Sequence, residues 1–362
     1  MINLYTPTIT NIEKRAVNDA LNSKKLSGST QLITDFENKF SQKYKLKYCL
    51  STNSGTSALH LALLSLGIGK GDEVIIPSLT FIATANAVNY VGAKPVIVDV
   101  ERNTYQISIE EIEKNINKNT KAIIPVHLYG NSPDLRKINQ IAKKYKLKII
   151  QDSAEALGTT FENKPSGSYG DIGIYSFYPN KLITTGEGGL LTTSSKNLYR
   201  KAKKLRGQGL KENTDEYIHD VVGYNYRMTS LSAALGIAQL KNIDSFLSKK
   251  ISIFNKYKKS LEPYGVSFIE TIPEVKNSYW LTVADFKSLN IDIDKLRNYL
   301  LKKKIETKKI FFPIDRQVIY KSKKTNKNSM DIYNNALCLP SYPGLTDKQV
   351  SYIISQVISY IK

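Results

Sequence analysis

One lysine and one aspartate are placed where their side chains could do chemistry together. Lys181 lies in the segment SFYPNKLITTGEGG (176–189), between a short apolar strand candidate and a glycine-rich return into a second strand. Asp152 lies earlier, at the carboxyl end of the apolar run 148–151. An amine that bonds to an aldehyde and a carboxylate that faces a pyridinium nitrogen are the protein groups that pyridoxal 5'-phosphate (PLP) needs most. The pair therefore predicts a PLP-dependent enzyme.

A second segment, NSGTSAL (53–59), predicts a seat for an anion. It places Gly55 and Thr56 at the start of a helix directly after a strand. Free backbone N–H groups and the positive end of the helix dipole favour a phosphate there. A simple helix N-cap explains the same residues. Lys181 and Asp152 are the context that favours the phosphate interpretation.

Two further segments each have a functional and an ordinary explanation. In PSLTFIAT (77–84), the ring of Phe81 could lie flat on a planar cofactor, although aromatic residues at such junctions are usually buried packing. GYNYRM (223–228) is a polar and aromatic cluster just before a long helix, and a capping loop would account for it.

Hydrophobic periodicity predicts the elements that position these residues. Short apolar runs predict strands over 48–51, 73–76, 95–98, 122–126 and 147–151. Helical patterns between them predict helices over 57–66, 84–91, 109–116 and 135–145. This alternation predicts an α/β fold with a mostly parallel sheet between helices, in which ligands gather at the carboxyl ends of the strands. Asp152 and Gly55 both fall at such ends.

The chain is long enough for two domains, and its pattern changes after Leu231. A long helical stretch through about residue 258 leads to shorter strands and a final amphipathic helix. The apolar stripe of that helix comprises Val350, Ile353, Ile354, Val357, Ile358 and Ile361. We therefore predict a large PLP-binding domain over residues 1–240 and a small C-terminal domain over residues 241–362.

Composition favours a cytoplasmic enzyme. The 362 residues are 41% apolar and 23% charged. No apolar run approaches the length of about 18 residues that a membrane span needs, and the N-terminus has no secretion signal. The net charge of +20 comes from lysines spread along the whole chain. Because no nucleic-acid motif accompanies them, we expect a solvated surface and no nucleic-acid partner.

The sulfur and imidazole groups predict no metal site. Cys49 and Cys338 lie far apart among apolar neighbours and are expected to be core residues in a reducing compartment. The three histidines and two cysteines never fall at ligand spacing.

Five segments together resemble a known family. They are NSGTSALHLALL (53–64), PVHLYGN (125–131), QDSAEALG (151–158), SFYPNKLITTGEGG (176–189) and VVGYNYRMTSLSAALGIAQL (221–240). Over nearly the whole chain, their order and spacing resemble the sugar aminotransferase family of fold-type-I PLP enzymes, and within it the perosamine synthases. The resemblance implies a large domain with a mostly parallel seven-stranded sheet between helices, plus a smaller C-terminal α/β domain.

The resemblance also implies a role for each residue that faces the cofactor ring. Lys181 matches the lysine that bonds to the cofactor and shuttles a proton to the substrate carbon. Asp152 matches the partner of the pyridinium nitrogen. Glu155 falls where relatives have Glu or Gln close to the phenolic oxygen, and Phe81 falls where an aromatic side chain stacks on the ring.

The phosphate of the cofactor is implied to lie between two subunits. Gly55, Thr56 and Ser176 match its contacts from one subunit. Asn225 matches the residue that relatives contribute across the dimer interface. The resemblance therefore implies a homodimer with shared active sites.

The implied reaction has two halves. L-glutamate converts PLP to its aminated form, pyridoxamine phosphate (PMP), and C4 of a nucleotide-linked 4-keto-6-deoxyhexose then takes the amine. The product, of the GDP-perosamine or UDP/dTDP-viosamine type, would serve glycan or polysaccharide biosynthesis. Double-displacement kinetics are expected.

Two positions in the segment 305–315 depart from the perosamine synthases. Lys308 stands where they tend to have arginine, and Asp315 where they tend to have histidine. Lysine lacks the planar bidentate grip of arginine, and aspartate reverses the charge of an imidazolium. The nucleotide and the hexose configuration therefore stay open among GDP-4-keto-6-deoxymannose and UDP- or dTDP-4-keto-6-deoxyglucose.

Two other functions remain as alternatives. Tyr178-Pro179 resembles the PLP-dependent nucleotide-sugar 3-dehydratases, but in that group a histidine replaces the lysine, and Lys181 argues against it. A catalytically silent PLP-sensing or nucleic-acid-binding protein would need a missing lysine or a fused DNA-binding domain, and the chain shows neither.

Overall fold

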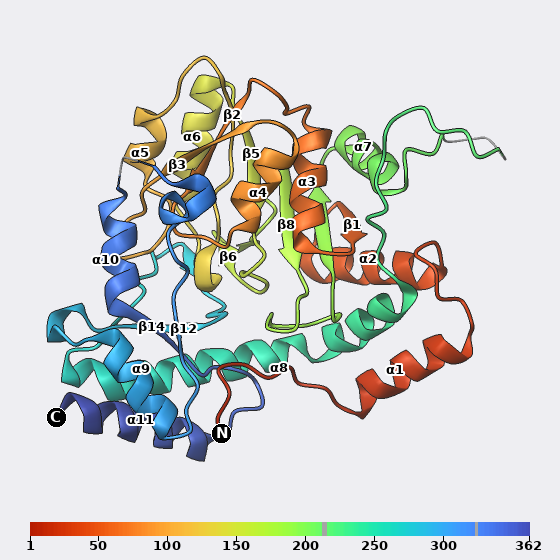
Figure 1. The fold of residues 1–362 in the computed structure, drawn as a ribbon. Helices are drawn as coiled ribbons and strands as arrows, with labels where there is room; N and C mark the ends of the chain where they lie inside the picture. Colours follow the sequence, from red (N-terminus) through yellow and green to blue (C-terminus); the bar gives the residue numbers. More distant parts are fainter. Residues whose placement is uncertain (212–215, 323–324) are drawn as a thin grey trace.

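The computed structural model describes residues 1–211, 216–322 and 325–362, and its centre is a seven-stranded sheet (Figure 1). Every strand of this sheet except β9 runs in the same direction, as the βαβ pattern predicted. The order across the sheet is β1 (Tyr48–Thr52), β9 (Gly189–Thr193), β8 (Ile172–Ser176), β5 (Lys148–Asp152), β4 (Thr120–Ile123), β2 (Glu73–Pro77) and β3 (Lys94–Val98).

Helices cover both faces of the sheet because its strands are apolar on both faces. In β2, Val74 and Ile76 pack in a core with α3, α4 and α7, whereas Ile75 between them packs with α5 and α6. Successive side chains of a strand point to opposite faces, so a fully covered strand needs a continuous apolar run. The helices are α1 (Asn11–Asn22), α2 (Gln31–Tyr44), α3 (Gly55–Ser65), α4 (Ala83–Tyr90), α5 (Ile109–Lys114), α6 (Leu135–Tyr145), α7 (Lys196–Arg206), α8 (Ser230–Leu261), α9 (Ile293–Lys302), α10 (Lys327–Asn335) and α11 (Asp347–Ile361).

Local chemistry explains where elements begin and end. Helix α6 has the predicted bounds, whereas α3 begins two residues before its predicted start. The side chain of Ser54 accepts a hydrogen bond from the backbone N–H of Ser57 and thereby caps α3. Strand β4 ends at Ile123 rather than at residue 126. Pro125 has no N–H group with which to extend a strand ladder.

The C-terminal third of the chain packs around a second, antiparallel sheet. Its order is β10 (Ser267–Phe268), β12 (Thr282–Asp285), β14 (Ala336–Leu339) and β13 (Lys308–Lys309). A three-stranded sheet of β11 (Val275–Lys276), β6 (Thr160–Phe161) and β7 (Lys164–Pro165) combines strands from both parts of the sequence.

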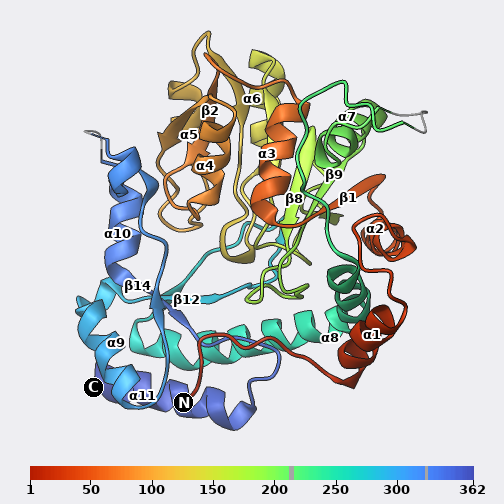
Figure 2. The ribbon, with the colours of Figure 1, turned by 45° about the vertical axis from the view of Figure 1, so that its right-hand side comes forward.

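Helix α8 contributes to the cores of both parts and runs beneath the large sheet in both views (Figures 1 and 2). Ile243 and Phe246 pack with α2 and strands of the large sheet. Further along, Ile253 and Tyr257 pack in the C-terminal core with α9 and α11. The boundary predicted at residue 240 falls inside α8 and stays a prediction.

The apolar stripe predicted for the last helix faces this C-terminal core. Val350, Ile353, Ile354 and Val357 of α11 are buried there. Among the described residues, no helix has both the length and the apolarity needed to cross a membrane.

Candidate functional site

Three of the predicted residues lie where strands of the large sheet end. Asp152 is the last residue of β5, Ser176 is the last residue of β8, and Gly55 begins α3 shortly after β1. Strands β5 and β8 are paired neighbours, and β1 runs in the same direction as both. Their carboxyl ends therefore meet at one edge of the sheet, as the pattern predicted.

Lys181 follows β8 and has its amine buried against acidic and aromatic groups. Its side chain is 12% exposed, and its Nζ lies 3.5 Å from Oε1 of Glu155. On another side, Nζ lies 3.9 Å from the ring centroid of Trp280. Burial lowers the pKa of the Lys181 amine, and the carboxylates of Glu155 and Asp152 oppose that shift. A lowered pKa favours the neutral amine, which is the form that attacks an aldehyde or accepts a proton.

Asp152 is a buried carboxylate that two hydrogen bonds from neighbouring segments orient. Oδ2 accepts a hydrogen bond of 2.8 Å from the hydroxyl of Thr84, and Oδ1 accepts one of 3.2 Å from the backbone N–H of Ala154. Burial raises the pKa of Asp152, while these two bonds and the charge of Lys181 act in the opposite direction. The bonds orient the carboxylate and favour its charged form.

Glu155 connects Lys181 to the segment that follows β4. Its Oε2 accepts a hydrogen bond of 3.0 Å from the backbone N–H of Tyr129. Burial raises the pKa of Glu155 to about 7, and Lys181 and the Tyr129 bond lower it in part. Glu155 is therefore a buried acid whose charge changes close to neutral pH.

The start of α3 forms a close contact with the end of β8. A Cβ added to Gly55 would lie 3.0 Å from Cβ of Ser176, so glycine allows the two segments to approach. Thr56 follows in the first turn and is half-buried. Backbone N–H groups in the first turn of a helix have no intrahelical carbonyl, which leaves them for an anion.

Phe81 is not the buried core residue that its sequence position would ordinarily suggest. The side chain is 55% exposed, and its ring centroid lies 5.8 Å from that of Phe311. It lies between β2 and α4, at the same edge as Asp152. An exposed ring at this edge is available to a planar ligand.

Asn225 lies beside the start of α3. Its backbone oxygen accepts a hydrogen bond of 3.4 Å from the side chain of Asn53, and Asn225 itself is exposed. The structure thus joins Lys181, Asp152 and Glu155 in one cluster and brings Gly55 against Ser176. Phe81 and Asn225 are both exposed.

The chemical groups at this edge of the sheet fit those of PLP. A buried amine of lowered pKa, a carboxylate held by two hydrogen bonds, and a helix start that begins with glycine meet at one edge of the sheet. These groups suit an aldehyde, a pyridinium nitrogen and a phosphate, respectively. Among the described residues, no three histidine, cysteine, aspartate or glutamate side chains gather as metal ligands would.

Three residues that surround this cluster could not be identified from sequence patterns. Thr84 holds Asp152, Tyr129 holds Glu155, and Trp280 lies against Lys181. Tyr129 lies within the segment PVHLYGN, which supported the family resemblance but assigned no role to the tyrosine. Trp280 is the one tryptophan of the chain, yet nothing in its local pattern links it to residue 181.

Asp315, one of the two departures from the perosamine synthases, is bonded within the protein. The side chain is buried and accepts hydrogen bonds from the hydroxyl of Ser78 and from the backbone N–H of Asn326. Its carboxylate therefore joins the loop after β13 to the end of β2. Lys308, the other departure, is exposed in β13.

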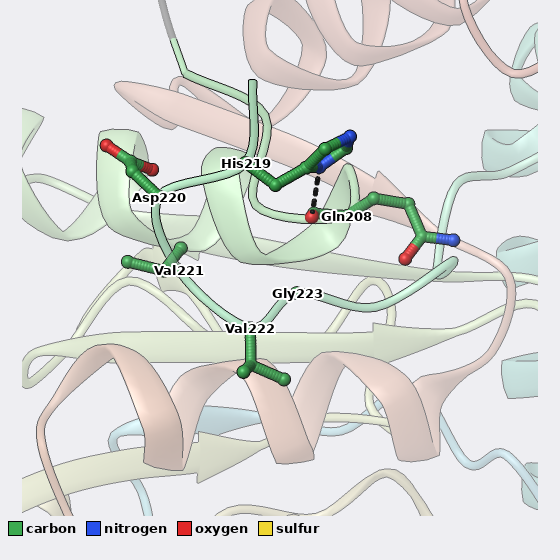
Figure 3. A pocket seen from close by; sticks show the side chains of 6 residues that line it. All are labelled: Gln208, His219, Asp220, Val221, Val222 and Gly223. Carbon is green, nitrogen blue, oxygen red and sulfur yellow. Dashed lines mark hydrogen bonds between the residues drawn. The ribbon is translucent and has the colours of Figure 1, made fainter. Parts of the chain in front are cut away.

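A surface hollow lies on two projecting segments, residues 207–211 and 216–225, which we call the strap (Figure 3). The two segments are joined by several hydrogen bonds, including one of 2.9 Å between Nδ1 of His219 and the backbone oxygen of Gln208. The lining comprises Gln208, His219, Asp220, Val221, Val222 and Gly223, none of which is a predicted site residue. Val222 is 85% exposed there.

Comparisons with known proteins agree over nearly the whole length of the chain. Residues 7–358 match the model of the DegT/DnrJ/EryC1/StrS aminotransferase family. GDP-perosamine synthase of Escherichia coli O157:H7 is 42% identical over 358 residues, which are 98% of this chain and 97% of that protein. GDP-perosamine synthase of Vibrio cholerae is 36% identical over 365 residues, which are 99% of each protein.

Among solved structures, the PLP-form of Spr1654 from Streptococcus pneumoniae is similar to this chain with a TM-score of 0.93. It is 27% identical, and the match covers 99% of this chain and 98% of that one. The PMP-form of the same protein is 28% identical with a TM-score of 0.93, and the match covers 99% of this chain and 96% of that one.

Proposed function

Because the chain belongs to the DegT/DnrJ/EryC1/StrS aminotransferase family, and is thus a PLP-dependent aminotransferase, we propose that it transfers an amino group from L-glutamate to C4 of a nucleotide-linked 4-keto-6-deoxyhexose. The family resemblance and the cofactor predicted from the motifs are confirmed. The observation that carries the proposal is the buried amine of Lys181 among Glu155, Asp152 and Trp280.

We assign the catalytic proton transfers to Lys181. When bound, PLP withdraws electrons from the substrate carbon that loses a proton. Burial lowers the pKa of Lys181, so Nζ in its neutral form accepts that proton and returns it at a neighbouring position. Asp152, oriented by Thr84 and Ala154, holds a proton on the ring nitrogen by favouring the charged form.

The remaining contacts hold the cofactor in place. Gly55, Thr56 and Ser176 are proposed to bind the phosphate at the start of α3, because first-turn N–H groups and hydroxyls offer donors to an anion. Phe81 is proposed to cover one face of the ring with its exposed side chain. Glu155 is proposed to lie near the phenolic oxygen.

The identity of the relatives favours a nucleotide-linked 4-keto-6-deoxy sugar as acceptor. Those at 42% and 36% identity are GDP-perosamine synthases, and the matches span almost the whole of each protein. The net charge of +20 suits a ligand with two phosphates. The 3-dehydratase and the silent sensor are not favoured, since Lys181 is present and placed for transamination.

We infer that the enzyme works as a homodimer. The strap projects from the body of the subunit beside α7 (Figure 2). It carries exposed apolar side chains. Tyr217 is 91% exposed and Val222 is 85% exposed, and Ile218 and Val221 on the same segment are exposed as well. Exposed apolar residues that gather on one segment are typical of a surface that binds a partner. Asn225 at the base of the strap would then contact the phosphate in the partner subunit.

We place the reaction in the cytoplasm. Cys49 and Cys338 are both buried and free, as expected in a reducing compartment. This cellular location is proposed whichever nucleotide the sugar substrate carries.

An acceptor panel tests the reaction directly. The purified protein should be yellow and should bleach on addition of L-glutamate. The bleached protein should then convert one member of a panel of GDP-, UDP- and dTDP-linked 4-keto-6-deoxy sugars to an amino sugar, detected by mass spectrometry. Colour that persists with every amino donor would point to a sensor, and amination of 3-keto sugars alone would contradict transfer to C4.

Substitution of Asn225 tests the shared site. We expect Asn225→Ala to weaken cofactor retention, because a donor to the phosphate is lost. Mixed dimers with one altered subunit should lose one of their two sites, as measured by bound cofactor per dimer after gel filtration. Asn298→Ala on the exposed face of α9 is the matched control, and dimers that carry it should retain both cofactor sites. A fully active monomer in sedimentation would contradict the shared site.

A further inference from the structure

We propose that Tyr5, Trp280 and Lys250 form a clamp that positions Lys181 from the C-terminal part of the molecule. Tyr5 and Trp280 bind two successive backbone carbonyls at Lys181. Lys250 binds the backbone of Trp280 directly and is linked to Tyr5 through Ser341 and Leu4. The proposal rests on the proposed function of Lys181. None of the three is among the residues assigned above to the cofactor, so each acts as a positioning residue.

The loop that carries Lys181 needs support from outside itself. Residues 177–188 form neither helix nor strand. Backbone hydrogen bonds from Phe177 to Gly188 and from Thr185 to Phe177 join the two ends of the loop but do not involve the carbonyls of Asn180 and Lys181. A turn bond of 2.9 Å from the N–H of Lys181 to the carbonyl of Tyr178 is the main local restraint on the lysine. The carbonyl groups of Asn180 and Lys181 are partly buried, and polar groups withdrawn from water require hydrogen-bond partners.

Those donors come from Trp280 and Tyr5. The indole Nε1–H of Trp280 donates to the backbone oxygen of Asn180 at 2.6 Å, and the hydroxyl of Tyr5 donates to the backbone oxygen of Lys181. These two oxygens belong to the two peptide planes that flank Cα of Lys181. Because each peptide unit is planar, a hydrogen bond to each plane restrains φ and ψ of the lysine, and with them the direction in which its side chain leaves the backbone.

Trp280 is itself held on three sides. Its backbone oxygen accepts a hydrogen bond of 2.6 Å from Nζ of Lys250. Its ring is stacked with that of Tyr129, with centroids 5.9 Å apart and an interplanar angle of 9°. The same ring lies 3.9 Å from Nζ of Lys181. Trp280 therefore restrains the lysine both at its backbone and at its amine.

The second arm of the clamp also leads to Lys250. Tyr5 follows Leu4, whose backbone oxygen accepts a hydrogen bond of 3.3 Å from the N–H of Ser341. Nζ of Lys250 donates to the backbone oxygen of Ser341 and, at 3.0 Å, to its hydroxyl oxygen.

Lys250 is a buried hub between the two arms. It is 1% exposed and faces three acceptors: the backbone oxygens of Trp280 and Ser341 and the hydroxyl of Ser341. A lysine ammonium has three N–H donors, one for each acceptor. Lys250 lies on α8, and the N-terminal segment runs alongside that helix (Figure 1). The clamp thus ties the loop of Lys181 to the helix shared by both cores.

Removal of single donors tests the clamp. Tyr5→Phe and Trp280→Phe each keep an aromatic ring and remove one donor, and the double variant removes both. A loosened loop should let Nζ of Lys181 reach water, which relieves the burial that lowers its pKa. The readout is the pH dependence of the rate at which the apoprotein captures PLP, followed by absorbance, because the neutral amine is the reactive form. In the double variant, the midpoint should rise by about one pH unit.

Turnover supplies a second readout. The double variant should lose about ten- to a hundredfold in kcat with KM for the nucleotide sugar unchanged, since a misplaced base affects the chemical step and not sugar binding. Lys250→Met keeps the length of the side chain without its donors and should shift the midpoint in the same direction. If Trp280→Phe does not fold, Tyr5→Phe alone should still raise the midpoint.

Tyr169→Phe is the matched control, because it also removes a tyrosine hydroxyl that donates to a backbone carbonyl, that of Phe161, at 2.8 Å. It should leave the midpoint unchanged. An unchanged midpoint in the double variant, or an equal shift in Tyr169→Phe, would overturn the clamp. A wild-type apoprotein that captures no PLP would instead contradict the proposed function, so the two failures are distinguishable.

Discussion

Lys181→Ala should lower turnover by several orders of magnitude while the protein still binds its cofactor. The substitution removes both the amine that bonds to PLP and the base that moves the substrate proton. The contacts proposed for the ring and the phosphate, at Asp152, Phe81 and Gly55, remain. Amino-sugar formation is measured by mass spectrometry, and cofactor content by absorbance after denaturation.

The control for this variant is another lysine. Lys348→Ala removes an exposed ammonium from α11 and should leave both turnover and cofactor content at wild-type values. Near-normal catalysis by Lys181→Ala would remove Lys181 from the mechanism. Loss of activity through loss of cofactor alone would show as an empty protein and not as a loaded, inactive one.

Asp152→Asn should slow the half-reaction with L-glutamate by about a hundred- to a thousandfold, because the neutral amide no longer favours a protonated ring nitrogen. The side chain keeps its size, and its amide oxygen can still accept one of the two bonds from Thr84 and Ala154. The rate is measured in single turnover from the bleaching of the bound cofactor. A rate within about tenfold of wild type would contradict the role assigned to Asp152.

Thr84→Val is the matched companion of Asp152→Asn. It removes the hydroxyl that donates to Oδ2 of Asp152 but leaves the carboxylate. A hydrogen bond to a charged group contributes about 1.5 to 3 kcal/mol. We therefore expect Thr84→Val to slow the half-reaction with L-glutamate by about ten- to a hundredfold, which is less than the effect of Asp152→Asn. A larger effect of Thr84→Val would mean that the threonine has a role beyond orienting the carboxylate.

Much of the large sheet was predictable because its strands are short, apolar and separated by helices. The predicted strand over 73–76 became β2 with Val74, Ile75 and Ile76 alternating between two cores. Small shifts occurred where a cap or a proline decided an end, as at Ser54 for α3 and Pro125 for β4. Hydrophobic periodicity and helix capping depend on residues close together in the chain, so both can be recognised in a single sequence.

Some residues of the predicted site could also be identified from the nearby sequence. Asp152 ends one apolar strand, and Lys181 follows shortly after another, as their sequence positions indicated. That these two strands pair side by side was shown only by the structure. Phe81 illustrates the limit, because its sequence position allowed both a buried and an exposed ring. In the structure Phe81 is 55% exposed, and its ring contacts that of Phe311, which is far away in the sequence. How much of the ring is covered therefore depends on long-range packing.

Local patterns were sufficient for the α/β alternation, for the strand ends and for the lysine and aspartate that follow them, since each depends on residues within a few positions of one another. The surroundings of Lys181 are instead a product of long-range packing. Trp280 reaches the carbonyl of Asn180 across 100 residues of chain, and Tyr5 reaches that of Lys181 across 176. Such contacts exist because two hydrophobic cores share α8 and bring distant segments together, and no local pattern encodes which donor then meets which acceptor.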